Sequence, residues 1–361
     1  MGGFSMKSLF KFLFPIAMGL MLVGCGAEGS TTDNEGASNE KVINLTASIH
    51  NAPGIPFSDG FTQYLEEIEK RTDGKVKFEI FYSATLASEN DIVDALADGV
   101  VDVAVVNPEY QSGKMSLGTI TNNPGLYNNI WSAVMALNDL YDNNPAMQEN
   151  LENLKIKKIG VFVQPPHIIH SSKDISSYDD VKNLRVLTTS SIQADVAKKV
   201  GMTPVGMGIN DAYEAMDKGT IDAVLQNFNA AAALGFDEVL KSMWLLPVSG
   251  QSSVYAMSMD KWNSLPDDVK GIIEEVNSEF NADHNSKIFA GAEKHNEERY
   301  LGEDININQP TDEDLNKLNT LSGPIWEAWI KEQEKNGFDG QGVFDNLVEL
   351  LADYEKQIPN K

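Results

Sequence analysis

Two segments of the chain carry the same fourteen-residue pattern, and this repeat limits the folds that the chain can adopt. Residues 94–107 read DALADGVVDVAVVN, and residues 214–227, which lie 120 positions later, read EAMDKGTIDAVLQN. The matched pairs are Gly99 with Gly219, Asp102 with Asp222, and Asn107 with Asn227. In each window the pattern predicts a helix that ends at the glycine and a buried strand that follows it.

The segments before the two windows also repeat, because strands and helices alternate in both. Residues 42–49 and 75–82 are typical of strands, and the helix between them carries Phe61, Leu65 and Ile68 on one face. A strand at 184–188 and a helix near 190–200 precede the second window. The sequence therefore predicts two strand–helix–strand–helix–strand units, each forming its own doubly wound α/β sheet.

Ligands of open α/β sheets bind beyond the carboxyl ends of the strands. Asn107 and Asn227 stand at such ends, so we expect both to face a crevice between two lobes. Glu109 and Tyr110 follow Asn107 and are interpreted either as cleft-lining residues or as part of a surface turn. His50 ends the first strand and lines the cleft or lies in a loop without a role. Gln164, which ends another strand, is expected to contact the ligand.

The C-terminal part differs from the repeated units. Residues 244–247 and 252–259 are predicted strands that return to the first lobe, and a helix of about 35 residues, about 50 Å long, begins near Pro266. Two shorter helices are expected around 312–336 and 343–356. We therefore assign residues 41–162 and about 250–290 to lobe I, and residues 163–249 and about 291–361 to lobe II.

The N-terminus has the features of an export signal. Residues 1–24 combine Lys7 and Lys11 with a short apolar stretch, which is typical of a signal peptide. The segment ends in Leu-Val-Gly before Cys25, which resembles a bacterial lipobox. We therefore predict a lipid on Cys25, a flexible tether over 25–40 and an extracytoplasmic, membrane-anchored protein. The alternative is an ordinary signal peptide with a chance cysteine.

Composition excludes several classes of function. The net charge of -25 disfavours nucleic acid as a partner, and the single cysteine allows no internal disulfide or thiolate metal cluster. No nucleophile elbow, phosphate loop or zinc-protease motif is present, so no catalytic residue, metal or cofactor is predicted. His167 and His170 are too few for a metal site. Two enclosed carboxylates would still permit acid–base chemistry, which leaves an enzyme as an alternative.

Five further motifs resemble one known family. They are LEEIEKRTDGKV at 65–76, ADGVVD at 97–102, DVKNLRV at 180–186, AYEAMDKGTID at 212–222 and WNSLP at 262–266. In this order they resemble the solute receptors of TRAP transporters, the DctP-like family, over about 42–330. The resemblance implies a two-lobed periplasmic-binding-protein-like fold (type II-like) with a ligand cleft between the lobes and a long helix spanning both. It also implies a monomeric receptor that delivers a small polar organic solute to membrane permease subunits, or alternatively a sensory lipoprotein.

The sequence departs from the family pattern at two places. Leu187 stands where the family usually has an arginine that pairs with a substrate carboxylate, and Gln226 keeps an amide where the family tends to have Gly-x-Glu-Asn. We therefore expect a neutral, zwitterionic or cationic ligand. Arg185, two residues before Leu187, is interpreted as structural, or alternatively as the residue that clamps a carboxylate. The predicted ligand contacts are His50, Asn107, Glu109, Tyr110, Gln164, Arg185, Thr188, Gln226, Asn227 and Asn229.

Overall fold

The computed structural model describes residues 42–302 and 304–359 of the chain. The predicted signal peptide, Cys25 and the predicted tether lie outside these residues. Within the described part, no helix combines the length and the apolar character needed to cross a membrane.

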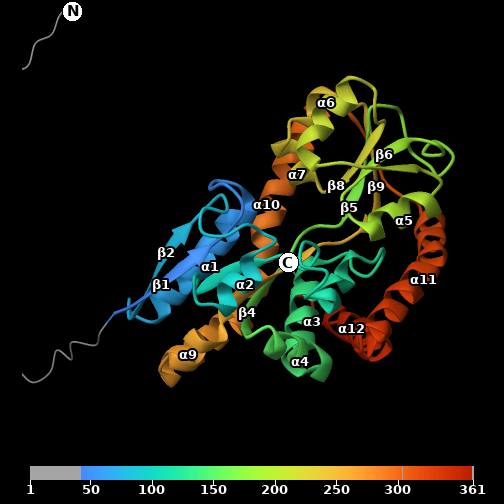
Figure 1. Cartoon of the computed structure of the whole chain (residues 1–361). Coiled ribbons are helices and arrows are strands. Elements are labelled where there is room, and N and C mark those ends of the chain that lie inside the picture. Colours follow the sequence, from blue (N-terminus) through green and yellow to red (C-terminus); the bar gives the residue numbers. More distant parts are fainter. Residues whose placement is uncertain (1–41, 303, 360–361) are drawn as a thin grey trace, which may run out of the picture. The chain divides into compact units, whose positions relative to one another are not determined.

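Two β-sheets organise the described residues (Figure 1). The first has the order β2 (Val76–Phe81), β1 (Ile43–Ser48), β3 (Val103–Val106), β10 (Ser252–Ser258), β4 (Ile156–Val163). The second has the order β11 (Asn306–Asn308), β9 (Ser242–Ser249), β5 (His167–Ser171), β8 (Ala223–Gln226), β6 (Arg185–Thr188), β7 (Thr203–Gly206). Each sheet with its helices forms one lobe, which confirms the predicted two-lobed α/β fold.

Both sheets combine a parallel part with antiparallel strands. In the first lobe β1 is parallel to β2 and β3, whereas β10 is antiparallel to β3 and β4. In the second lobe β6 is parallel to β7 and β8, whereas β5 is antiparallel to β8 and β9. Strand β10 returns to the first sheet as predicted, but β9 remains in the second. The chain therefore crosses between the lobes after β4 and again after β9.

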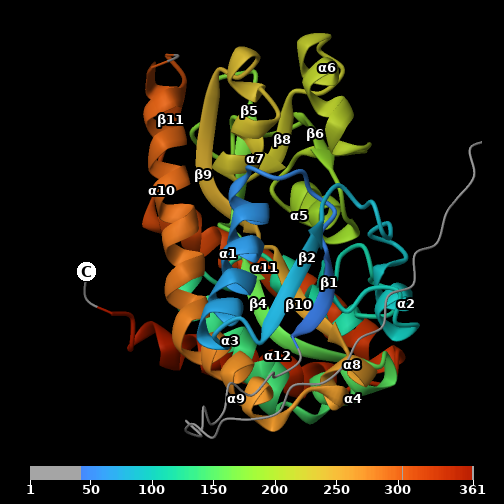
Figure 2. The ribbon, with the colours of Figure 1, turned by 90° about the vertical axis from the view of Figure 1, so that its left-hand side faces the viewer.

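Helices cover the faces of both sheets (Figures 1 and 2). They are α1 (Pro56–Arg71), α2 (Ile92–Ala97), α3 (Ile130–Asn143), α4 (Pro145–Asn153), α5 (Ser191–Lys199), α6 (Ala212–Asp217), α7 (Phe228–Ala233), α8 (Met259–Ser264), α9 (Asp267–Glu275), α10 (Asn281–Gly302), α11 (Asp312–Lys335) and α12 (Gly340–Glu355). A π-helical turn over Val276–Phe280 joins α9 to α10. The helical run from 267 to 302 matches the predicted long helix.

Helix α10 contacts both lobes. In the first lobe Asn281 Nδ2 donates to Val161 O (2.8 Å), and Asn285 Oδ1 accepts from Val163 N (2.8 Å). One end of the helix is thereby fixed to strand β4. Farther along, Asn296 Nδ2 donates to Asn229 Oδ1 of α7 in the second lobe (2.7 Å).

The repeated sequence windows adopt the same local geometry. Gly99 and Gly219 end their helices with positive φ angles of 70° and 64°, which a residue with a side chain rarely adopts. Asp102 Oδ2 accepts a hydrogen bond from Thr46 N of β1 (2.8 Å), and Asp222 Oδ2 accepts one from Arg185 N of β6 (2.9 Å). Each aspartate therefore joins the start of its strand to the neighbouring parallel strand.

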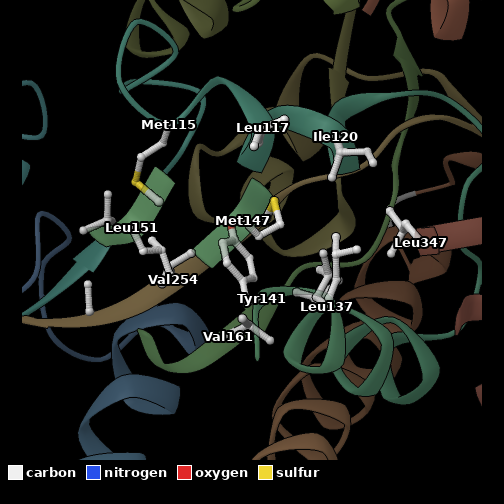
Figure 3. Packing of buried hydrophobic residues seen from close by; sticks show 14 of the residues in the cluster. Met115, Leu117, Ile120, Leu137, Tyr141, Met147, Leu151, Val161, Val254 and Leu347 are labelled. Atoms are coloured by element: carbon white, nitrogen blue, oxygen red, sulfur yellow. The ribbon is translucent and has the colours of Figure 1, made fainter. Parts of the chain in front are cut away.

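Helix α12 packs on the first lobe, which corrects the assignment of residues from about 291 to 361 to the second lobe. Its Leu347 lies in the hydrophobic cluster shown in Figure 3, together with Leu137 and Tyr141 of α3. Asn346 also accepts a hydrogen bond from Asn144 Nδ2 (3.1 Å). The apolar face of α12 is thus covered by α3, a contact that no local sequence pattern indicates.

Candidate functional site

Two short segments connect the lobes and lie side by side. Residues 164–166 lead from β4 to β5, and residues 250–251 lead from β9 to β10. Tyr127 OH donates to Gln164 O (2.8 Å) and accepts from Gln251 N (3.0 Å), so one side chain holds both crossings. Gly250 fits here because a Cβ atom at this position would lie 2.5 Å from Thr121 O.

A cavity of about 320 Å³ opens beside these crossings and is lined by both lobes. Most of the predicted ligand contacts line it: His50, Asn107, Glu109, Tyr110, Gln164, Gln226, Asn227 and Asn229. The other lining residues are Asn51, Ile55, Pro56, Phe57, His167, Thr189, Ile209, Ala230, Leu234, Gln251 and Phe289. The carboxyl ends of β1, β3 and β8 therefore meet at one cavity, as the strand-end rule predicts.

Asn107, at the end of β3, is fixed by neighbours on the first lobe. Its Oδ1 accepts from Ser253 Oγ, and its Nδ2 donates to Glu89 Oε1 (2.6 Å). His50 Nδ1 also lies 3.0 Å from Glu89 Oε1. Burial lowers the pKa of His50 to about 4, so its ring is neutral at physiological pH. Burial also raises the pKa of the Glu89 carboxyl.

Glu109 is the carboxylate of the cavity wall. Gln251 Nε2 donates to its Oε1, and Asn122 Nδ2 donates to its Oε2 (3.2 Å). Burial is the largest cause that raises the pKa of Glu109 to about 7; the amide of Asn122 acts in the opposite direction. Tyr110 stands beside it with 45% of its surface exposed, which places it at the cavity mouth.

Asn227 has two roles on the second lobe. Its Oδ1 accepts from Ala230 N (2.9 Å) and caps α7, while its Nδ2 donates to Gln164 Oε1 (3.0 Å). Asn227, which the sequence repeat predicts at the crevice, thus lines the cavity and also caps the start of a helix. Asn229, on the first turn of α7, is 9% exposed and is held by the hydrogen bond from Asn296.

Arg185 and Thr188, which were among the predicted ligand contacts, do not line the cavity; for Arg185 this agrees with its interpretation as a structural residue. Arg185 stands at the first residue of β6, and its Nε donates to Asp222 Oδ2 (3.0 Å). The cavity lies at the other end of this strand, where Thr189 rather than Thr188 contributes to the lining. Arg185 is four positions before Thr189, so the alternation of side chains along a strand puts both on the same face. However, Arg185 lies at the end of β6 that is away from the cavity.

Leu187, which stands where the family usually has an arginine, lies in apolar surroundings. Leu187 has no exposed surface and packs in the hydrophobic core of the second lobe with Met216 and Val224. Among the lining residues that the structure describes there is neither lysine nor arginine. The described part of the cavity wall therefore has carboxylate and amide groups but no permanent cation.

Sequence reasoning missed several cavity residues. His167 lines the cavity from the start of β5, and Gln251 lines it from the second crossing. Phe57 and Phe289 add an apolar surface from α1 and α10. The position of Gln251 between two predicted strands was a usable signal, whereas nothing local marked the phenylalanines. Over the described residues no group of three or more His, Cys, Asp and Glu side chains is arranged to hold a metal ion.

The two lobes, the paired crossings and the shared cavity define a two-lobed solute receptor. The chain belongs to family 7 of the bacterial extracellular solute-binding proteins (DctP), whose model matches residues 47–333. Members of this family are the receptors of TRAP transporters, act outside the cytoplasm with membrane permease components and are not enzymes.

Similar proteins agree with this family. The protein of Comamonas testosteroni described as outer membrane transporter protein TsaT is 23% identical over 287 residues, or 78% of this chain and 83% of that protein. A TRAP periplasmic solute-binding protein from Desulfovibrio salexigens superposes with a TM-score of 0.76 at 25% identity, covering 88% of this chain and 98% of that one. One from Rhodoferax ferrireducens, with copurified benzoate, superposes with a TM-score of 0.77 at 18% identity, covering 88% and 100%.

Proposed function

We propose that this receptor captures a small polar organic solute other than a simple carboxylate and delivers it to the permease of a TRAP transporter. The observation that carries the proposal is the cavity wall, which presents Glu109 but, over the described residues, no lysine or arginine. In the proposal Cys25 carries a lipid that anchors the receptor at the membrane, and the protein acts as a monomer.

Burying a carboxylate without a cation costs several kcal/mol, roughly 3–5 when one partner of a buried pair is missing. In this cavity the cost would be increased by repulsion from Glu109. The competing ligand class is a carboxylate, such as the benzoate that copurified with the Rhodoferax ferrireducens receptor. Binding it through Arg185 would require that side chain to leave Asp222, which holds both Nε and one terminal nitrogen at 3.0 Å.

A thermal-shift panel tests the proposal. Polyols, amines and amino-acid-like compounds should raise the melting temperature more than mono- and dicarboxylates. Saturation at 100 times the Kd adds about 2.7 kcal/mol to the free energy of unfolding, which such a panel detects.

The matched control is Arg185→Ala, which should leave the ranking and the Kd of the best compound unchanged because Arg185 lies at the far end of β6. The ligand part of the proposal is wrong if succinate or pyruvate binds most tightly and Arg185→Ala abolishes that binding.

A further inference from the structure

Four buried polar atoms of the cavity-lining residues have no hydrogen-bond partner within the described part of the chain. They are Nδ1 of His50, which lies 3.0 Å from Glu89 Oε1, Nε2 of His167, Nδ2 of Asn229 and Oδ1 of Asn51. His167 is 3% exposed and Asn229 is 9% exposed. Unpaired buried polar atoms are rare because they have lost water without a replacement, and a bound solute can supply the missing partner.

Neighbouring hydrogen bonds determine which atom of His167 carries the proton. Thr189 N donates to Gln193 Oε1 (2.9 Å), which fixes the orientation of the Gln193 amide. Gln193 Nε2 therefore donates to His167 Nδ1 (2.9 Å), and Nδ1 is the acceptor. Burial lowers the pKa of His167 to about 4, so the ring is neutral and its proton is on Nε2. Nε2 is thus a hydrogen-bond donor without an acceptor at hydrogen-bonding geometry, although the side chain of Gln251 lies close enough to raise the pKa of the ring against the effect of burial.

Asn229 provides a second donor on the same lobe. Its Oδ1 already accepts the hydrogen bond from Asn296 Nδ2 (2.7 Å), which leaves the two protons of its own Nδ2 for a ligand. The second lobe therefore offers two uncharged N–H donors at the cavity.

The first lobe presents the opposite chemistry. The unpartnered Oδ1 of Asn51 is an acceptor, and Glu109 contributes a carboxylate whose hydrogen bonds come from the neutral amides of Gln251 and Asn122. The Glu89 carboxylate lies behind this wall, bonded to Asn107. Phe57 and Phe289 add apolar surface to the cavity wall. The cavity is thus acceptor-rich and anionic on one lobe, and donor-rich and uncharged on the other.

We propose that the solute is a small amine carrying one positive charge, with an uncharged oxygen as its second polar group. Its ammonium pairs with Glu109, and its hydroxyl, ether or carbonyl oxygen accepts from His167 and Asn229. A zwitterion is less suitable, because its carboxylate would meet two neutral donors and no cation. This inference rests on the proposed receptor function and specifies its substrate class.

Compounds that share one skeleton test the charge requirement. Tyramine, tyrosol and 4-hydroxyphenylacetate place an ammonium, a hydroxyl and a carboxylate on the same hydroxyphenyl group. The aliphatic series 5-aminopentan-1-ol, pentane-1,5-diol and 5-hydroxypentanoate repeats the comparison without a ring. By calorimetry at pH 8, the amine of at least one series should bind tenfold or more tightly than its neutral counterpart, and the carboxylate should bind weakest.

Substitutions then assign the two ends of the ligand. Glu109→Gln should weaken amine binding at least tenfold and change neutral binding less than threefold, whereas Glu149→Gln, on the exposed face of α4, should change neither. His167→Phe should reduce the preference for tyramine over phenethylamine, which lacks the hydroxyl, towards one. Asn229→Leu tests the same end of the ligand if His167→Phe does not fold.

Each possible result bears on one of the two proposals. A neutral compound or a carboxylate as the tightest binder, or amine binding that Glu109→Gln leaves intact, would overturn the inference while leaving a solute receptor. A failure of every compound, including the broader panel above, would instead count against the receptor function itself.

Discussion

Gln164 and Gln251 stand on the two short strand-to-strand segments that connect the lobes and are hydrogen-bonded to each other twice. Gln164 N donates to Gln251 O (3.0 Å), and Gln164 Nε2 donates to Gln251 Oε1 (2.8 Å). The same side chains contact Asn227 on the second lobe and Glu109 on the first. Gln164 and Gln251 therefore belong both to the short connections between the lobes and to the cavity wall, next to Asn227 and Glu109.

Ligand binding is expected to close the lobes, because contacts to both cavity walls are made together only in a closed state. Small-angle scattering should show a smaller radius of gyration when the best compound of the panel saturates the protein, with an unchanged molecular mass. Superimposable scattering profiles with and without that compound would contradict closure.

Gly250→Ala is expected to destabilise the protein by about 1–3 kcal/mol, because the added methyl group overlaps Thr121 O and the Tyr127 ring at the crossing. Urea denaturation measures this change. Gly271→Ala is the matched control: its Cβ meets no atom within 4 Å, and it lies inside α9, where alanine should stabilise the helix by up to about 1 kcal/mol. Equal effects of the two substitutions would argue against a close-packed crossing.

The stability of the ligand-free protein should depend on pH through Glu109. Its folded-state pKa is raised from 4.5 to about 7, so its stabilising contribution is complete below about pH 4.5 and is lost as the pH rises through 7. Relative to Glu109→Gln, the wild-type protein should therefore lose free energy of unfolding between pH 5 and pH 8. Urea melts of both proteins at several pH values measure the difference.

In these urea melts, only the difference in free energy of unfolding between the wild-type protein and Glu109→Gln reports on Glu109. His50 and His167 have lowered pKa values, so they destabilise the fold as the pH falls from 6.5 towards 4, and they do so in both proteins. Parallel pH profiles for wild type and Glu109→Gln would show that Glu109 titrates normally. In the presence of an amine, binding should weaken as the pH falls below 7, because Glu109 then becomes neutral.

Cys25→Ser should abolish incorporation of a fatty-acid probe in cells and release the receptor from the membrane, because the thiol is the only group in the lipobox-like segment that can accept a diacylglycerol. Metabolic labelling followed by membrane fractionation measures both effects. Unchanged labelling of Cys25→Ser would mean that the segment is an ordinary signal peptide.

Much of the fold could be predicted from local patterns. The windows that end in Asn107 and Asn227 contain a helix period, a glycine that ends the helix and a buried strand, and each of these depends on neighbouring residues alone. Parallel strands place their carboxyl ends at one edge of a sheet. These local patterns were therefore enough to predict that both asparagines lie at the cavity. The repeat also implied equivalent positions for Asp102 and Asp222, which the structure confirms.

Local patterns accounted for the alternation of strands and helices, the two lobes, the long helix and the strand ends that carry polar side chains. Long-range packing was needed to place Arg185 against Asp222 away from the cavity, to bring His167 and Gln251 into its lining, and to pack α12 on α3. These two groups of features differ in the distance along the chain between the interacting residues. Helix periods and turns arise between residues a few positions apart, whereas the partner of a side chain is set by contacts between segments far apart in the chain, which a single sequence does not encode locally.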